Sequence, residues 1–512
     1  MVNHIPWAPL ARRAARWIRS APFVWIALLI VGEIILARRQ QATPSGFDES
    51  YFVWEGWAVN HHLVPYRDFI EFKPPVVFWM NGLALRLFGA SGFGFRWLFV
   101  LSLVLATVLL FVVLCRRGSD RALAFLAAFA VAFATMAPHL HDTGLDDSET
   151  IGMLFFLYGM TALLWVGALG DFTVVLGGAL LSLAVLSKEP YAFPVLATWA
   201  TLGFLAREER GLAWRRYAAL TTLGVTLVVV PVLLYLVATR ALPFYLRDVR
   251  LYFSYAQQIG CEHPHSLGEL WQQAWQPLRD RILIPDMFAS AVPLLVAFAV
   301  LSGTGLAVRI GLVLSVLGGF YSVSLGGCYF SHYFIMGLTG LFLWIVLGAL
   351  ALSRWLAAAP FDLRRWVRWA LLAGAVVHIG PTVALAARTS YPIPHGDTLN
   401  IPPGVVAFVK KSTSPRDTIF SDGSPALYVL TDRRPAIREV CLLDELMPGS
   451  AGQSDEKRLA PLRAELLAGP PKVVYFGPEF ASRKQRTRNA LWIPFLRDQH
   501  YQRISDELYL RP

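Results

Sequence analysis

Residues 93–121 read FGFRWLFVLSLVLATVLLFVVLCRRGSDR, an apolar run that ends in a basic turn. As a helix, the run at 93–114 is long enough to cross the roughly 30 Å of hydrocarbon in a bilayer. The turn carries Arg116, Arg117 and Arg121, and turns rich in arginine stay on the cytoplasmic side of a membrane. The segment therefore predicts a transmembrane helix that enters from outside and ends inside.

The same pattern recurs along most of the chain. Its composition is 55% hydrophobic and only 16% charged, and the mean hydropathy is +0.49. A chain of 512 residues with this composition is too apolar to fold as one soluble globule. We expect about eleven transmembrane helices, near residues 21–38, 93–114, 121–138, 149–168, 172–187, 190–206, 217–238, 287–305, 308–325, 332–353 and 368–388.

The charges indicate how these helices are oriented. The net charge of +11 comes largely from short basic clusters between apolar runs, which is a topological pattern rather than a surface for nucleic acid. The turns at 116–121, 207–216 and 353–368 are then cytoplasmic, as is the N-terminus. The loop 39–92, the turn 139–148, the loop 239–286 and everything after 389 lie outside. The four cysteines show no zinc-binding spacing.

A change of composition near Pro394 predicts a second, water-soluble domain over 394–512, after a transmembrane module over 1–393. Pro403 is placed to begin a helix, and a polar helix is expected at 454–468. The segments 417–422, 426–436 and 472–477 have the pattern of short strands. The fold class expected is thus a polytopic α-helical membrane protein with a small extracytoplasmic α/β domain at its C-terminus.

The loop 39–92 contains GFDESYFVWEGWAVNHHLVPYRDFIEFKPPVVFW and holds several charges at the membrane surface. Its aromatic residues could let an amphipathic segment lie flat in the headgroup layer. Asp48 has two interpretations of equal weight, a helix N-cap with Phe47 and Phe52 as a hydrophobic staple, or a functional carboxylate. Lys73, before a Pro-Pro pair that opens the next helix, could either snorkel to the surface or bind an anion.

The turn PHLHDTGLDDSET at 138–150 is a second concentration of charge. Three interpretations remain open. Its carboxylates could bind a divalent cation, Asp147 or Ser148 could cap the next helix, or Glu149 could be a catalytic carboxylate that faces the first loop. Lys188, Glu189, His332 and Tyr333 lie at the outer ends of other helices, on the same side of the membrane.

The order of motifs in the first loop resembles that of the GT-C glycosyltransferases. The acidic pair and tyrosine (Asp48, Glu49, Tyr51) are followed by GWAVNHHLVPYRDF, KPP and LFG. The sequence is most similar to bacterial members of the protein O-mannosyltransferase and aminoarabinose transferase group. The likeness continues in the turn with Glu149, in GGCYFSHYF near 326–334 and in a terminal α/β domain. Ser50 stands where aminoarabinose transferases have arginine, so the motif does not identify the acceptor.

The resemblance implies an inverting glycosyltransferase. A sugar would pass from a polyprenyl-phosphate donor of the undecaprenyl type to a hydroxyl of a lipid, glycan or protein acceptor. Asp48, Glu49 and Glu149 would be the catalytic residues, with Asp48 as the base or acceptor-positioning group. Lys73 would hold the lipid phosphate, with help from Arg67 or an arginine of the loop 239–286. The substrate-binding set implied is Lys73, Tyr51, Tyr66, Arg67, Asp146, His332 and Tyr333.

The expected location is a bacterial cytoplasmic membrane, with the C-terminal domain on its periplasmic or outer side and with membrane lipids as partners. No metal site and no cofactor are predicted, although a divalent cation remains an option. The alternative function is a membrane transporter or a flippase for lipid-linked sugars. Such proteins often have repeated halves and charges near the bilayer midplane. Here Glu33 is the main intramembrane charge and no internal repeat is visible, which favours the transferase.

Overall fold

A computed structural model of the chain describes residues 22–41, 47–90, 94–137, 140, 147–165, 170–256, 269, 294, 296–298, 300–301, 303–325, 330–388, 401–422, 425–438, 455–477 and 491–512. Its first part is helical. The helices are α2 (Pro22–Gln41), α3 (Phe47–Asn60), α4 (Val76–Phe88), α5 (Arg96–Arg116), α6 (Arg121–Thr135), α7 (Ser148–Leu164), α8 (Asp171–Val185), η3 (Glu189–Tyr191), α9 (Ala192–Arg210), α10 (Trp214–Ala238), α11 (Leu242–Ala256), α14 (Leu306–Ser324), η4 (Ser331–Tyr333), α15 (Phe334–Ala358) and α16 (Phe361–Arg388).

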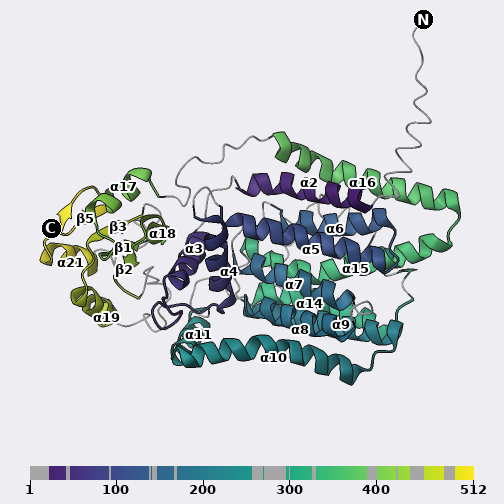
Figure 1. Cartoon of the computed structure of the whole chain (residues 1–512), viewed down its shortest axis with the longest axis horizontal. Coiled ribbons are helices and arrows are strands. Elements are labelled where there is room, and N and C mark those ends of the chain that lie inside the picture. Colours follow the sequence, from purple (N-terminus) through teal and green to yellow (C-terminus); the bar gives the residue numbers. More distant parts are fainter. Residues whose placement is uncertain are drawn as a thin grey trace, which may run out of the picture.

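The long helices form one bundle, with their axes running roughly side by side (Figure 1). α2 and α16 line one edge of the bundle, and α10 lines the opposite edge, where it packs on α8. α15 is the central helix and packs against α6, α7 and α14. The shorter helices α3, α4 and α11 lie across one end of the bundle, between the long helices and the C-terminal domain.

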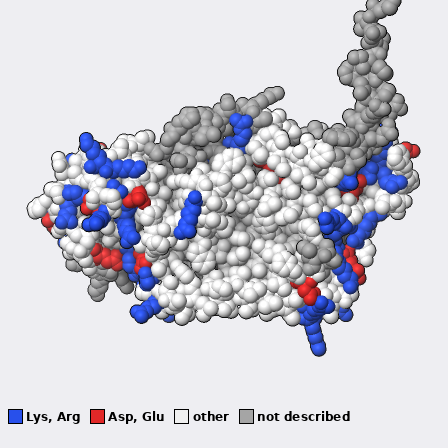
Figure 2. All heavy atoms as spheres, in the orientation of Figure 1, with Lys and Arg blue, Asp and Glu red and all other residues white. Residues whose placement is uncertain are grey.

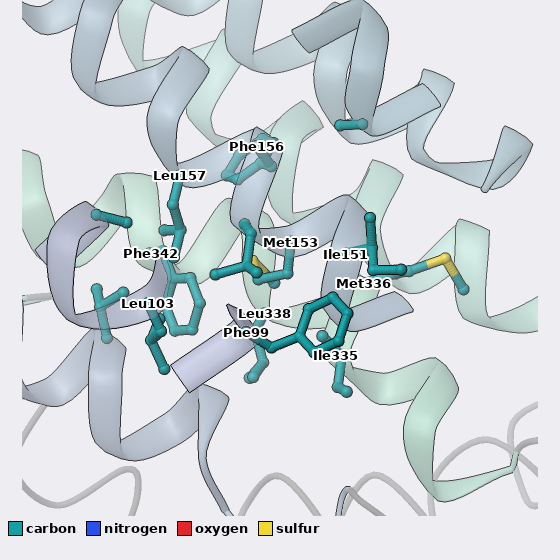
Figure 3. Close-up of a cluster of buried hydrophobic side chains, with 14 of the residues drawn as sticks. Phe99, Leu103, Ile151, Met153, Phe156, Leu157, Ile335, Met336, Leu338 and Phe342 are labelled. Atoms are coloured by element: carbon teal, nitrogen blue, oxygen red, sulfur yellow. The ribbon is translucent and has the colours of Figure 1, made fainter. Parts of the chain in front are cut away.

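Apolar side chains from sequence-distant helices fill the centre of the bundle (Figure 3). They come from α5, α7 and α15, and α7 contacts both of the other two helices. The labelled members are Phe99, Leu103, Ile151, Met153, Phe156, Leu157, Ile335, Met336, Leu338 and Phe342, and all are buried. Close packing of this kind holds helices together where lipid tails are as apolar as the side chains.

The outer surface matches a membrane-spanning bundle. Figure 2 shows a broad uncharged belt over the long helices, with lysine, arginine, aspartate and glutamate gathered at the two ends. Large apolar side chains such as Leu196, Leu234 and Val300 are exposed on the described part of this surface. Among the described residues, four helices are long and apolar enough to cross a membrane, namely Arg96–Arg116, Trp214–Ala238, Leu306–Ser324 and Ser331–Ala358. The chain is a multi-pass membrane protein.

Ten of the eleven predicted spans correspond to long or medium-length helices, from α2 to α16. The span at 287–305 lies largely outside the described residues. The number of membrane crossings and their orientation stay predictions, because several of the helices are shorter than a full crossing requires.

Ion pairs join the helices at the end of the bundle opposite the C-terminal domain. The carboxylate of Glu209 in α9 pairs with Arg117, just after α5, and with Arg354 of α15 at 2.6 Å. Arg368 of α16 pairs with Asp120, the N-cap of α6. These are the basic turns that the sequence assigns to the cytoplasmic side, and their acidic partners come from neighbouring turns.

The C-terminal part is a small α/β unit around a five-stranded sheet in the order β2-β1-β3-β5-β4. β1 is parallel to β2 and to β3, whereas β5 is antiparallel to β3 and to β4. Its elements are α17 (Pro403–Ser412), β1 (Thr418–Asp422), α18 (Ala426–Thr431), β2 (Arg434–Pro435), α19 (Asp455–Ala468), β3 (Val473–Phe476), α21 (Ile493–Asp498), β4 (Gln502–Arg503) and β5 (Leu508–Leu510).

The predicted strand at 426–436 is wrong in its first half, because residues 426–431 form α18. Pro425 precedes this helix and Asp432 ends it in the left-handed conformation, with a φ of 56°. The β-forming composition of the segment is overridden because the Tyr428 hydroxyl accepts a hydrogen bond from the Ser421 backbone and fixes α18 against β1. The other two predicted strands and the helices at 403 and 454–468 are confirmed. The predicted domain boundary near Pro394 lies outside the described residues.

The aromatic residues of the first loop do not form a lipid-facing surface. Tyr51, Phe52, Trp54 and Trp57 of α3 are all buried in protein, which corrects the expectation of a helix lying flat in the headgroups. Trp54 packs edge-on against the ring of Phe69, with the centroids 5.0 Å apart. The helix is covered on one side by α4 and on another by α18.

The C-terminal domain contacts α3 through polar groups as well. The indole of Trp57 donates a hydrogen bond of 3.1 Å to Asp432, and the same carboxylate oxygen lies 3.0 Å from Nε2 of His61. The ring of Tyr428 packs near Trp54, at 6.1 Å between centroids. The domain is therefore docked on the first loop rather than standing away from it.

We predict that Gly56→Ala separates α3 from α4. A Cβ at Gly56 would lie 2.5 Å from the backbone of Asn81 and of Gly82, and a helix backbone cannot move aside as a flexible side chain can. The expected loss is about 1–3 kcal/mol or more of stability, seen as a lower melting temperature of the detergent-solubilised protein. Gly404→Ala, whose Cβ would meet no atom within 4 Å, is the control. Equal melting temperatures of the two variants would contradict this packing.

Candidate active site

The acidic pair of the first loop lies in the first turn of α3, at the end of the bundle next to the C-terminal domain. Asp48 is the second residue of the helix rather than its N-cap, so the capping interpretation does not describe its position. A carboxylate in the first helical turn is favoured by the helix dipole. The Asp48 side chain is 36% exposed, which leaves its carboxylate accessible.

A histidine from a distant part of the chain faces Asp48. His332, in η4, places Nε2 at 3.9 Å from Oδ2 of Asp48. The His332 side chain is almost wholly buried, and its ring stacks on Phe330 with 5.7 Å between centroids. Burial and stacking fix the imidazole, so the Asp48–His332 approach is set by the fold.

Glu149 and Lys188 form a buried ion pair beside this histidine. The Lys188 ammonium lies 2.5 Å from the Glu149 carboxylate, and both side chains are less than a tenth exposed. The hydroxyl of Ser148 donates to the other carboxylate oxygen at 2.7 Å. Lys188 also lies over the ring of Tyr333, 4.7 Å from its centroid, which is a cation–π contact. The ends of α7, α8 and η4 thus meet at one place.

The segment from Tyr66 to Lys73 carries the third charged group. Tyr66 is fully buried and has a φ of 66°, in the left-handed region that bulky residues rarely adopt. Its hydroxyl donates a hydrogen bond of 2.6 Å to the backbone carbonyl of Lys73. The Tyr51 hydroxyl, from α3, donates to the carbonyl of Ile70 at 3.0 Å. Two tyrosines of the first loop therefore fix the backbone that presents Lys73.

Carboxylates surround the Lys73 ammonium. Glu71 is buried, and its Oε1 accepts backbone hydrogen bonds from Phe72 at 2.7 Å and Lys73 at 2.9 Å. Burial would raise the pKa of Glu71, but the Lys73 charge, a hydrogen bond with Glu55 and these amides together lower it. Burial would likewise lower the pKa of Lys73, but Glu71 and Asp48 raise it overall. Both groups are consequently charged near neutral pH.

Lys73 is also close enough to the other charges to interact with them. The nearby Lys188 opposes the rise in the pKa of Lys73, whereas the Asp48 carboxylate supports it. The Lys73 ammonium lies over the ring of Phe52, 4.4 Å from the centroid. The structure thus pairs Lys188 with Glu149 and places His332 beside Asp48, and the charges of Asp48 and Lys188 both act on the pKa of Lys73.

Glu49 has a different environment from its neighbour Asp48. Its carboxylate pairs with Arg96, at the start of α5, through Nε at 2.7 Å and through Nη2. Both side chains are 0% exposed. A bidentate arginine–carboxylate pair is among the strongest in proteins, and here it joins α3 to the bundle. The geometry gives Glu49 an anchoring contact, and its catalytic role stays a prediction.

Asp147 is the N-cap of α7, as one interpretation of the acidic turn expected. Its Oδ1 accepts a hydrogen bond of 2.6 Å from the amide of Thr150. Burial, with the nearby Glu149 charge adding to it, raises the pKa of Asp147 to about 8. Asp147 caps the helix as a neutral acid at pH 7, which leaves Glu149 as the charged carboxylate of the turn.

The remaining predicted residues are placed as follows. Arg67 is engaged with its neighbour Asp68, at 2.8 Å from Nε, and with the carbonyl of Thr239 at 3.3 Å. Asp146 lies outside the described residues. In the ranges that the structure describes, no three histidine, cysteine, aspartate or glutamate side chains are grouped to hold a metal ion.

Sequence reasoning missed two residues of this site, Arg96 and Glu55, and the partner of a third, Lys188. Arg96 stands at the start of an apolar run, and an arginine in that place is interpreted as marking the end of a transmembrane helix. Glu55 is fully buried seven residues beyond Asp48 in α3, among aromatic residues, and its carboxyl group lowers the pKa of Glu71. Lys188 was noticed as a charge at a helix end, but only the fold shows that it pairs with Glu149.

Comparison with known proteins supports the resemblance to glycosyltransferases that the sequence indicates. The family model described as dolichyl-phosphate-mannose-protein mannosyltransferase matches residues 72–235, about a third of the chain. ArnT from Cupriavidus metallidurans, solved bound to undecaprenyl phosphate, has 14% sequence identity and a TM-score of 0.57. The match covers 96% of this chain and 99% of that one. The chain resembles the GT-C glycosyltransferases in sequence and has their fold. The resemblance predicted from the first loop is thereby confirmed.

Another protein with this GT-C fold is the Archaeoglobus fulgidus oligosaccharyltransferase. Its complex with Zn and sulfate gives 15% identity and a TM-score of 0.52, covering 94% of this chain and 73% of that one. The same archaeal enzyme, AglB, in complex with an inhibitory peptide and a dolichol-phosphate, gives 15% identity, a TM-score of 0.54 and coverages of 97% and 75%. Neither the family match nor these structures favour a transporter.

We predict that breaking the Glu49–Arg96 pair destabilises the protein. Glu49→Ala or Arg96→Ala leaves one buried charge without its partner, which typically costs about 3–5 kcal/mol. Removing both charges in Glu49→Leu/Arg96→Leu should recover part of that loss. The measurement is the melting temperature of the purified protein, with the exposed pair Arg216–Asp171 as control through Asp171→Ala. Single variants that melt like wild type would show that the pair is not an anchor.

We further predict that Asp147→Asn is well tolerated and that Asp147→Ala is not. Asparagine keeps an oxygen for the Thr150 amide, whereas alanine removes the cap and costs about 1 kcal/mol. Because the pKa of Asp147 is higher in the folded state (about 8) than in the unfolded chain, its stabilising effect is lost as the pH rises toward 8. The wild type should therefore lose stability relative to Asp147→Asn between pH 5 and pH 8. Parallel melting curves over this range would contradict the assignment.

Proposed function

We propose that this protein is an inverting glycosyltransferase that moves a sugar from a polyprenyl-phosphate donor to an acceptor hydroxyl at the outer face of a bacterial cytoplasmic membrane. The observation that carries the proposal is an accessible carboxylate, Asp48, which lies 3.9 Å from His332 at one end of the helical bundle and raises the pKa of Lys73. ArnT, which shares the fold, was solved with undecaprenyl phosphate bound. AglB was solved with a dolichol-phosphate.

The chemistry needs one group to accept a proton and another to hold the leaving group. As the acceptor oxygen attacks the anomeric carbon, the bond between that carbon and the phosphate oxygen breaks, and the hydroxyl proton passes to Asp48. Attack opposite the leaving group inverts the configuration. His332, fixed 3.9 Å from Asp48, then orients the carboxylate.

The departing polyprenyl phosphate gains negative charge. Lys73 offsets that charge, since its pKa is held above the ordinary value and it stays protonated. Lys188 adds a second positive charge, held in place by Glu149. In this arrangement Glu149 acts on the reaction through Lys188, and Glu49 acts by anchoring α3.

The proposal extends to the two parts of the chain. Residues 1–393 form the transferase module, with its active site in the loop 39–92, and residues 394–512 form an outer domain. The N-terminus is cytoplasmic. The acceptor is a lipid, glycan or protein hydroxyl.

Asp48→Asn and Lys73→Ala should each abolish sugar transfer while the protein remains folded. Loss of a general base or of the phosphate-binding charge typically lowers the rate by about 10²–10⁴-fold. The assay is transfer of labelled sugar from a panel of undecaprenyl-phosphate sugars in proteoliposomes.

The matched controls are Asp171→Asn and Lys410→Ala, which change the same residue types at exposed positions. Both should transfer sugar at the wild-type rate. Activity near wild type in both Asp48→Asn and Lys73→Ala would remove the basis for the proposed site. Transport of lipid-linked sugar without transfer would favour the flippase instead.

A further inference from the structure

The backbone around Lys73 is held from two sides, and one side belongs to the C-terminal domain. Arg438, which follows β2, donates a hydrogen bond from Nη2 to the backbone carbonyl of Tyr66 at 2.8 Å. The amide of Ile70 approaches the carbonyl of Arg438 at 3.4 Å. These two contacts join the C-terminal domain to a part of the first loop that lies 372 residues earlier in the chain.

The contact at Tyr66 falls on a strained residue. Its φ of 66° costs energy for a residue with a bulky side chain, and such a conformation persists only where neighbouring groups hold it. The Tyr66 ring is enclosed by Phe78, at 5.8 Å, and by Tyr245 of α11, at 4.8 Å between centroids. Arg438 supplies a charged donor for the carbonyl of this residue, and hydrogen bonds from charged donors are the stronger ones.

The side chain of Tyr66 carries the constraint onward. Its hydroxyl donates to the carbonyl of Lys73 at 2.6 Å, so the Tyr66 backbone and the Lys73 backbone move together. The guanidinium of Arg438 is itself fixed, since it lies 5.2 Å from the centroid of the Phe244 ring and its backbone amide donates to Glu465 at 3.2 Å. A continuous set of contacts thus runs from the C-terminal sheet to Lys73.

We propose that Arg438 of the C-terminal domain is a positioning residue that sets the place of Lys73 through Tyr66. The proposal rests on the proposed function in that Lys73 binds the donor phosphate. The C-terminal domain is then a working part of the donor site, and the first loop is complete only when the domain is docked. In this arrangement Arg438 acts on the donor site through the backbone carbonyl of Tyr66.

The test compares Arg438→Ala with Arg434→Ala, an exposed arginine four residues earlier whose contact to His61 is 3.5 Å long. In Arg438→Ala the KM for the undecaprenyl-phosphate sugar should rise about tenfold, as expected for one lost charged hydrogen bond. The KM for the acceptor should stay unchanged, because the loss is confined to the donor side. Arg438→Lys, which can still reach the carbonyl, should recover part of the effect. Arg434→Ala should behave as wild type.

A double-mutant cycle separates positioning from a direct electrostatic effect. If Arg438 acts through Tyr66, then Arg438→Ala has little further effect on the donor KM in a Tyr66→Phe background. Fully additive effects, or a donor KM unchanged in Arg438→Ala, would overturn the proposal. A general loss of folding would lower the melting temperature and would impair the use of donor and acceptor alike. An unchanged KM for the acceptor excludes that explanation.

A second measurement does not depend on enzyme activity. Hydrogen–deuterium exchange of the amides at 66–73 should accelerate in Arg438→Ala and not in Arg434→Ala. Affinity for undecaprenyl phosphate in nanodiscs should fall only in Arg438→Ala. If the wild type binds this lipid but transfers no sugar, while Arg438→Ala shows faster exchange and weaker lipid binding, the proposed function fails and the positioning role stands. If exchange and lipid affinity are unchanged while transfer is intact, the positioning role fails alone.

Discussion

Hydrocarbon cannot hydrogen-bond to a peptide group, and the whole arrangement of this protein follows from that constraint. The backbone in the belt must satisfy its own hydrogen bonds, so it is helical, and on the face shown in Figure 2 the charged side chains gather at the ends of the bundle. The chemistry of the protein must therefore be assembled where helices end. Asp48 in the first turn of α3, Glu149 in the first turn of α7 and His332 in η4 all meet this condition.

Charged side chains at the helix ends are paired, and each pair has a different effect on the structure. Glu49 and Arg96 are sealed from water and hold α3 in place. Asp48, the next residue, remains accessible. A single turn of helix thus buries one carboxylate in an ion pair and leaves the other accessible, because successive residues point 100° apart around a helix. Lys188 is paired with Glu149, and the charge of Glu71 raises the pKa of Lys73, so each lysine is kept protonated by a nearby carboxylate.

The C-terminal domain has a larger part in this site than its position in the chain suggests. Asp432 binds the side chains of Trp57 and His61 on α3, and Arg438 binds the loop that presents Lys73. Docking of a small sheet on the first loop explains why that loop can hold Tyr66 in a strained conformation. It also explains why the aromatic residues of α3 are covered by protein instead of lipid.

Hydropathy and the placement of charge were enough to predict the helical class and most helix positions. These are local properties, set by runs of apolar residues and by the charged turns between them. Only the tertiary structure decided which charged residues form pairs. Arg96 finds Glu49 across 47 residues, Lys188 finds Glu149, and Arg438 finds Tyr66 across 372 residues. No local pattern encodes such pairs, because they depend on how the helices pack and on where the C-terminal domain docks.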